Sequence, residues 1–174
     1  MFTKTIRLYG VYANILKKYV KANKDDETVS FQLTNNDDSK PQKVYVFETM
    51  YQCMITAAVL GMINNKRQSE SSDRETYATI FNEVLVKNNA TLKIIYEQMI
   101  LTDKSLQLDN DERIRKAFTP IEGEDNEKIE EEYFLSFVRG GLLIIDEMFK
   151  SCQTYEDLAN ELTRIQLKYS TASE

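Results

Sequence analysis

The sequence predicts a mainly helical, all-α protein containing a compact multi-helix domain. Apolar residues recur at helical spacing through most of the chain, and glycine (5) and proline (2) are scarce among its 174 residues. Hydrophobic residues make up 42% and charged residues 29%, a balance typical of a globular domain. A chain of this length buries enough surface to fold without a disulfide or a metal.

The N-terminal segment, residues 1–24, predicts a basic amphipathic helix over about 5–22. Leu8, Tyr12 and Ile15 fall on its apolar arc, and the segment carries six basic residues and no acidic one. The basic arc has two interpretations: a solvated face, which base rates favour, or a contact surface for an acidic partner or DNA. In the second interpretation the contact residues are Arg7, Lys17, Lys18 and Lys21.

Residues 25–43 are polar and predict a linker or a short strand. Alternating apolar residues from Val29 to Leu33 are compatible with a short hairpin near 29–47, with its turn at 35–38. In the alternative, which we favour slightly, Val44 begins the next helix.

A helical domain is expected over residues 44–169. Its most apolar helix covers about 47–64, and Ala57, Ala58 and Gly61 on that helix would let a second helix approach closely. The sequence Ser72-x-x-Glu75 predicts a capping box that opens the next helix. The expected buried stripe of that helix is Tyr77, Ile80, Phe81, Val84 and Leu85.

Further helices follow a break at Asn88-Asn89. A short helix is expected to begin at Asp109 or Asn110 and to end before Pro120. The acidic stretch 122–132 leads into a long helix whose apolar stripe continues through Gly140 and Gly141, so this glycine pair predicts a close helix–helix contact or a kink. Thr154 is expected to cap the last helix, and residues 170–174 are expected to fray.

The inventory of chemical groups argues against an enzyme. Histidine is absent, which excludes Ser-His-Asp and Cys-His catalysis and His-ligated zinc. Neither a phosphate-binding glycine loop nor a paired-cysteine motif occurs, and Ile114 and Pro120 stand where a calcium loop beginning at Asp109 would need glycine at its sixth position and glutamate at its twelfth. The acidic stretch is better interpreted as a solvated loop and helix start than as a Mg²⁺ site. We therefore expect no catalytic residue, no metal and no cofactor.

Charge and hydropathy also bear on location and partners. The net charge of −6 disfavours non-specific binding to nucleic acid. Cys53 and Cys152 are interpreted as reduced, buried thiols. The longest apolar run is far shorter than the roughly 18 residues that a membrane span requires. These features predict a cytoplasmic protein without a membrane partner.

Three stretches carry a family resemblance. FETMYQCMITAAVLGMINNKR at 47–67 and FVRGGLLIIDEMF at 137–149, followed by the capped helix 154–167, resemble the DNA phosphorothioation-associated protein 4 group. Members of that group are small accessory proteins of bacterial DNA-modification and anti-phage islands. A similar helical subunit accompanies the SMC-type ATPase of Lamassu defence systems. The matching residues are helix-packing residues, so the resemblance implies no catalytic residue.

The hypothesis is therefore a non-enzymatic accessory subunit of a multi-protein defence complex. Its expected partners are larger protein subunits of the same operon, such as an SMC-like ATPase or a nuclease, with DNA reached through the complex. The alternative is a DNA-contacting or regulatory protein that uses the basic N-terminal helix. An enzyme with a carboxylate–metal site is the least favoured of the three hypotheses.

Overall fold

The structure is a computed structural model that describes residues 2–21, 31–34, 40–119 and 122–170. Helices hold 63% of the described residues, so the mainly helical prediction is confirmed, whereas the label all-α is too strong because two short two-stranded sheets are present. The α-helices are α1 (Val11–Tyr19), α2 (Met50–Ile63), α3 (Asn82–Lys87), α4 (Asn89–Thr102), α5 (Asn110–Phe118), α6 (Glu124–Phe149) and α7 (Tyr155–Ser170). A short 3₁₀ helix, η1, spans Lys104–Leu106. The strands are β1 (Ile6–Tyr9), β2 (Gln32–Leu33), β3 (Gln42–Lys43) and β4 (Tyr77–Ile80).

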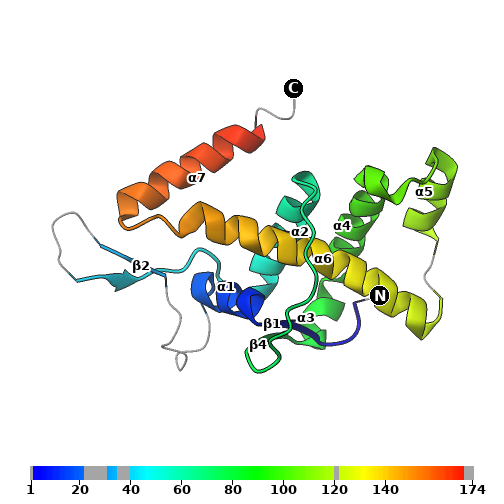
Figure 1. The fold of residues 1–174 in the computed structure, drawn as a ribbon, viewed down its shortest axis with the longest axis horizontal. Coiled ribbons are helices and arrows are strands. Elements are labelled where there is room, and N and C mark those ends of the chain that lie inside the picture. The colour runs from blue at the N-terminus through cyan, green and yellow to red at the C-terminus, as the bar shows by residue number, and fades with distance from the viewer. Residues whose placement is uncertain (1, 22–30, 35–39, 120–121, 171–174) are drawn as a thin grey trace.

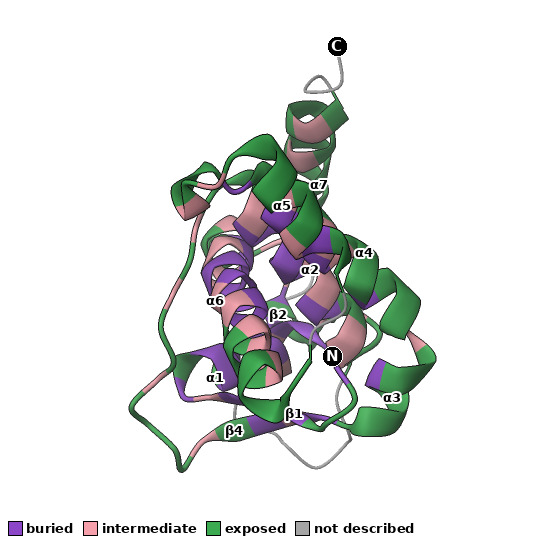
Figure 2. Cartoon of the chain, turned by 90° about the vertical axis from the view of Figure 1, so that its right-hand side faces the viewer, coloured by how far each residue is buried: buried purple, intermediate pink, exposed green. Residues whose placement is uncertain are grey.

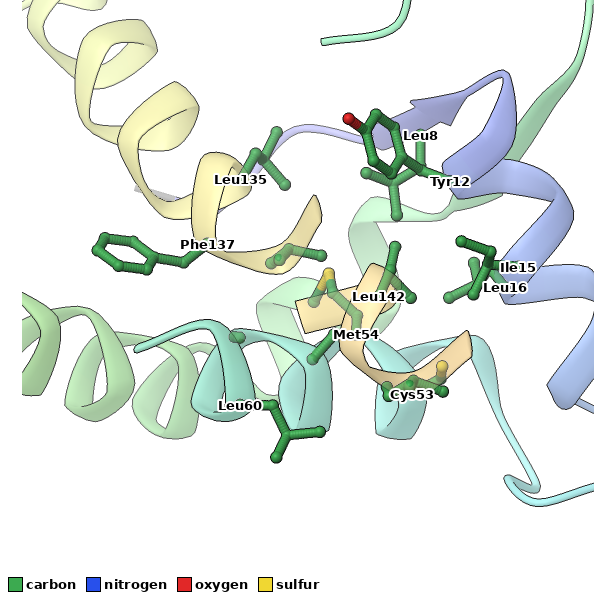
Figure 3. Packing of buried hydrophobic residues seen from close by; sticks show 14 of the residues in the cluster. Leu8, Tyr12, Ile15, Leu16, Cys53, Met54, Leu60, Leu135, Phe137 and Leu142 are labelled. Atoms are coloured by element: carbon green, nitrogen blue, oxygen red, sulfur yellow. The ribbon is translucent and has the colours of Figure 1, made fainter. Parts of the chain in front are cut away.

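The long helix α6 is the centre of the fold, and α2 crosses it with the most extensive packing between any two helices (Figure 1). Their shared side chains form the middle of the core, where Met54 of α2 lies beside Leu142 of α6 (Figure 3). Helix α1 contributes Ile15 and Leu16 to the same core. Helices α4 and α5 pack near the N-terminal half of α6, and α7 lies along its other end (Figure 1).

The N-terminal segment differs from the single helix expected over 5–22. Ile6 and Leu8 are buried in strand β1, and Gly10, at φ 57°, turns the chain into the shorter helix α1. Strand β1 pairs antiparallel with β4, so that Ile6 lies opposite Ile80. The helical prediction was wrong here because Leu8 faces the core whether its segment is a helix or a strand. Only pairing with β4, which is distant in the sequence, favours the strand.

The capping box predicted at Ser72 and Glu75 is also wrong. The Asp73 carboxylate accepts hydrogen bonds from the backbone N–H groups of Glu75 (2.9 Å) and Thr76 (3.3 Å), which makes a turn that leads into β4. The helix that follows, α3, begins only at Asn82. An Asx turn competes locally with a helix start, and pairing with β1 favours the turn.

Between α1 and α2 the hairpin alternative holds. Strands β2 and β3 pair antiparallel, with Gln32 opposite Lys43, although they are shorter than the hairpin over 29–47 that this alternative describes. The expected turn at 35–38 lies outside the described residues. Val44 does not begin a helix: its N–H donates to the Phe31 carbonyl oxygen, and α2 begins after the reciprocal capping box of Thr49 and Gln52.

The later helix boundaries agree with the sequence. Asn88 separates α3 from α4, and Asp109 forms a capping box with Glu112 at the start of α5. Thr154 Oγ1 accepts a 3.0 Å hydrogen bond from the Asp157 N–H at the start of α7. Helix α6 is continuous through its glycine pair. Pro120 and residues 171–174 lie outside the described residues.

The N-terminal segment is not a separate arm in the described structure, because its buried residues join the same core as α2 and α6. Figure 2 shows this burial on the inward faces of α2 and α6, whereas much of α3 and α5 is exposed. None of the helices in the described ranges is long and apolar enough to cross a membrane.

Candidate interaction surface

The four basic residues predicted to contact a partner do not share one helix face. Arg7 lies on the outer side of β1, with its guanidinium 5.7 Å from the Tyr77 ring centre. On α1, Lys18 Nζ lies 3.1 Å from Asp146 Oδ1 of α6, and the buried Tyr19 hydroxyl donates to the same oxygen. Lys21 lies 3.4 Å from Glu48 at the surface, and Lys17 also has an interaction within the chain. The expected continuous basic arc is therefore absent from the described structure.

The small residues singled out on two helices lie where those helices approach most closely. An added Cβ at Gly61 would lie 2.1 Å from the Phe137 carbonyl oxygen, and one at Gly141 would lie 1.7 Å from that of Ala57. At Gly140 the neighbour is the Lys66 carbonyl oxygen, at 1.9 Å, in the loop after α2. Ala57 and Ala58 are fully buried. The glycine pair therefore lies against protein backbone.

A buried arginine fixes the loop that passes over α6. The Arg139 side chain is only 2% exposed, and it donates to both carboxylate oxygens of Glu132 and to the Gln68 carbonyl oxygen, at 2.9 Å. The Gln68 N–H donates to the Ser136 carbonyl oxygen, and the Tyr12 hydroxyl donates to that of Ser69. The hydrogen bonds of Arg139 and its neighbours therefore hold the loop that contains Gln68 and Ser69 against α6.

A second polar cluster surrounds Asp103, whose side chain is 2% exposed. Its carboxylate accepts hydrogen bonds from the Ser105 hydroxyl (2.6 Å), the Ser105 N–H (2.9 Å) and the Tyr133 hydroxyl (2.9 Å). Arg67 lies 3.5 Å away and stacks near the rings of Tyr133 and Phe137. A hollow of about 310 Å³ adjoins Asp103, with Phe137 in its wall.

The electrostatics of this cluster favour an ionised carboxylate that stays in place. Burial alone would raise the pKa of Asp103, but the hydrogen bonds from Ser105 and Tyr133 and the nearby Arg67 charge outweigh burial, so that its pKa lies below the usual value. Burial also raises the pKa of the Tyr133 hydroxyl. A carboxylate that stays ionised and has all these partners is suited to holding η1 and α4 together rather than to accepting a proton from a substrate.

The two cysteine thiols are buried, and the described carboxylates do not gather into a metal-binding group. Burial raises the pKa of the Cys53 thiol to about 12, and burial also raises that of Cys152. Both thiols are therefore protonated and weak nucleophiles near neutral pH. Within the described ranges, no three Cys, Asp or Glu side chains are grouped so that they could hold a metal ion.

An exposed apolar surface with a hollow lies where β4 leads into α3. A hollow of about 340 Å³ is formed there by Met50 and Tyr51 of α2, the end of β4, the N-cap residue Phe81 and Val84 of α3. The side chains of Tyr77 (51%), Phe81 (61%) and Val84 (37%) are exposed, so the predicted buried stripe is wrong for these three residues, whereas Ile80 and Leu85 are buried as predicted. Leu85 alone on α3 reaches the core. A six-residue helix turns only part of its surface inward, which leaves the other apolar residues at the surface.

Beside this hollow, β4 has an edge that no described strand covers. The Gly10 N–H donates to the Thr76 carbonyl oxygen, which fixes the alternation of hydrogen bonds between β1 and β4. By that alternation the N–H and C=O groups of Tyr77 and Thr79 point away from β1. In the described part of the chain they have no backbone partner.

We call this area the β4–α3 surface; it consists of Met50, Tyr51, Thr79, Phe81, Val84 and Lys87. The sequence analysis missed it because its apolar residues were assigned to a helix core. Its signal was present: Tyr77, Ala78, Thr79 and Ile80 alternate between polar and apolar faces before a very short helix. An apolar hollow beside an open strand edge can bind protein segments, whereas the two buried polar clusters serve the fold.

Comparison of the chain with known protein families, with curated proteins and with solved structures gave no match.

Proposed function

We propose that this protein is a non-enzymatic accessory subunit that binds larger subunits of a cytoplasmic anti-phage or anti-plasmid DNA-defence complex. The observation that carries the binding role is the β4–α3 surface, where Phe81 and Val84 are exposed around a hollow. Exposed apolar surface of this kind marks interaction sites in folded proteins. The defence setting rests on the resemblance of the stretches at 47–67 and 137–149.

The buried charged groups support the same proposal. Arg139 and Asp103 are the buried charged residues of the described chain, and each is held by neighbours that belong to the fold. Neither group is left over for acid–base chemistry. The buried polar groups of this protein stabilise its own fold. Its exposed apolar surface lies beside an open strand edge. Together these features suit binding better than catalysis.

Direct DNA contact through the basic N-terminal residues has less support. Lys18 and Lys21 already face Asp146 and Glu48, which reduces the positive field that a phosphate backbone would meet. Arg7 lies on a strand, away from the lysines of α1. We therefore place DNA contact with the complex as a whole.

Co-expression with the products of neighbouring genes tests the proposal. The variant Phe81→Ser removes the aromatic ring while serine remains a favourable N-cap for α3, so the helix is kept. The matched control is Val86→Ser, because Val86 is 53% exposed on the same helix but does not line the hollow. We expect a stable complex with the wild-type chain and with Val86→Ser, and a clearly weakened one with Phe81→Ser. A complex that forms equally with all three chains would refute the role of this surface.

A further inference from the structure

We infer that the β4–α3 surface binds an extended partner segment, which adds as a strand to the free edge of β4 and places an aliphatic side chain in the hollow beside an acidic residue. This inference rests on the proposed binding function and specifies the chemistry of the partner. Three features that lie together carry it: a strand edge that no described strand covers, an apolar hollow next to that edge, and a lysine on the rim that has no ion pair among the described residues.

The open edge determines the backbone conformation of the partner. The outward N–H and C=O groups of Tyr77 and Thr79 are spaced as one side of an antiparallel or parallel ladder. An extended backbone satisfies such groups, and strand addition is a recurrent way in which proteins bind peptides. A helix cannot do so, because its backbone groups are bonded internally.

The hollow determines the apolar part of the partner. Its lining comes from α2, β4, α3 and the α3–α4 junction, and in the described chain no residue of β1 takes part, so it lies on the side of β4 that faces away from β1. Met50, Phe81 and Val84 provide apolar walls, and the volume of about 340 Å³ accommodates an aliphatic side chain. Alternate side chains of an added strand would point toward this hollow.

The rim determines the charged part of the partner. Lys87 is the charged residue that lines the hollow in the described structure, and no ion pair within the described residues involves it. Glu83 precedes it by one helical turn but does not line the hollow. A carboxylate on the partner, from Asp, Glu or a chain terminus, would complement the Lys87 ammonium group.

Two substitutions separate the edge from the hollow. Thr79→Pro removes the outward N–H of β4, and because that N–H takes no part in pairing with β1, the β1–β4 ladder keeps its hydrogen bonds. Thr79→Val is the matched control, since it keeps the N–H and favours a strand. Lys87→Glu reverses the rim charge, and Lys87→Arg retains it.

The experiment uses the full chain and a positional-scanning library of short synthetic peptides. We expect selected peptides to combine an aliphatic residue with a neighbouring Asp or Glu, and to contain no proline at the paired positions. For the best peptide, fluorescence anisotropy should show a Kd about three- to tenfold weaker with Thr79→Pro, as the loss of one backbone hydrogen bond predicts. Lys87→Glu should weaken binding in a salt-dependent way, whereas Thr79→Val and Lys87→Arg should bind as the wild type does.

A second measurement guards against a misfolded proline variant. In the wild-type chain, amide hydrogen exchange at Tyr77 and Thr79 should slow when the peptide binds. Unchanged exchange at both residues, a folded Thr79→Pro variant that binds with wild-type affinity, or a library with no selected peptide would each overturn strand addition. A wild-type dimer that Thr79→Pro converts to a monomer would identify a second copy of this chain as the occupant and would also overturn it.

The results also separate this inference from the proposed function. If Phe81→Ser abolishes the complex with a neighbouring gene product while Thr79→Pro leaves it intact, the binding function stands and strand addition is wrong. If no neighbouring product binds the wild-type chain while selected peptides still bind and are weakened by Thr79→Pro, the proposed place in a defence complex fails and strand addition stands.

Discussion

Gly141 of α6 lies so close to Ala57 of α2 that a Cβ atom at position 141 would fall 1.7 Å from the Ala57 carbonyl oxygen. Gly61 of α2 has the equivalent relationship to the Phe137 carbonyl oxygen, at 2.1 Å. In both cases the neighbour is backbone, which cannot rotate away as the end of a side chain can. The close packing of α2 on α6 therefore depends on glycine in both helices.

Replacing Gly141 by Leu should lower the free energy of unfolding by about 3 kcal/mol or more, the upper end of the range for overpacked cores. Gly141→Ala should also destabilise, even though alanine favours a helix by about 1 kcal/mol over glycine. Urea denaturation measures both effects. Ala159→Leu, at an exposed position of α7, is the control and should change stability little. A Gly141→Leu variant as stable as the wild type would contradict the packing role.

The glycine pair shows what sequence reasoning could reach in this chain. An apolar stripe that continues through Gly140 and Gly141 without a change of phase predicts one continuous helix with a close neighbour. Helix caps at Asp109 and Thr154 were equally accessible, because a cap is formed by residues only three or four positions apart. Local signals of this kind are complete within a short stretch of sequence.

The β1–β4 pair and the β4–α3 surface could not be reached in the same way. Ile6 and Ile80 are opposite each other in space but far apart along the chain, and neither segment alone distinguishes a strand from a helix. Because β4 was taken as helix, Phe81 and Val84 were assigned to a core that they do not enter. The β4–α3 surface was therefore missed for the same reason as the β1–β4 pair: both depend on pairing between segments that are far apart in the sequence.

The low pKa of Asp103 predicts a pH-dependent contribution to stability. The unfolded carboxyl, with an ordinary pKa of about 3.9, takes up a proton at higher pH than the folded one does. The contribution of Asp103 is therefore complete above that pKa and is lost as the pH falls through the lower native value. Asp103→Asn should cost about 1–3 kcal/mol near pH 7, through weakened hydrogen bonds from Ser105 and Tyr133.

Urea denaturation of the wild type and of Asp103→Asn over a pH series checks this prediction. The difference between the two chains should be constant near neutral pH and should shrink below about pH 4. A difference that stays constant into strong acid, or grows there, would show that the ionised carboxylate is not what stabilises this cluster.

The ion pair of Arg139 and Glu132 predicts that removing Glu132 lowers the free energy of unfolding more than removing Arg139 does. Glu132→Ala leaves the buried Arg139 charge with only the Gln68 carbonyl oxygen, and should cost about 3 kcal/mol. Arg139→Met leaves Glu132 in solvent, because that side chain is 55% exposed, and should cost only about 1–2 kcal/mol for the unpaired Gln68 carbonyl.

Thermal unfolding ranks the two variants, and hydrogen exchange at the Gln68 N–H reports on the loop, since this group donates to the Ser136 carbonyl oxygen. Exchange there should quicken in both variants. Equal losses of stability, or a larger loss for Arg139→Met, would mean that packing of the arginine side chain outweighs its charge.

Reversing the basic residues of the N-terminal segment should affect the fold as well as any partner. Lys18→Glu places a carboxylate beside Asp146, and Lys21→Glu places one beside Glu48. The Lys18–Asp146 pair is partly buried and shares its acceptor oxygen with the Tyr19 hydroxyl, so Lys18→Glu should lower stability by about 1–2 kcal/mol. Arg7→Glu, whose observed contact is with the Tyr77 ring, should lower it less.

The Tm of each single variant, measured at low and at high salt, checks this prediction. The loss in Lys18→Glu should be partly recovered at high salt, because salt screens the repulsion between the two carboxylates. Lys18→Gln removes the attraction without adding repulsion and should fall between Lys18→Glu and the wild type. If Lys18→Glu melts at the wild-type temperature in low salt, its contact with Asp146 contributes nothing to the fold, and the lysines of α1 become available to an acidic partner after all.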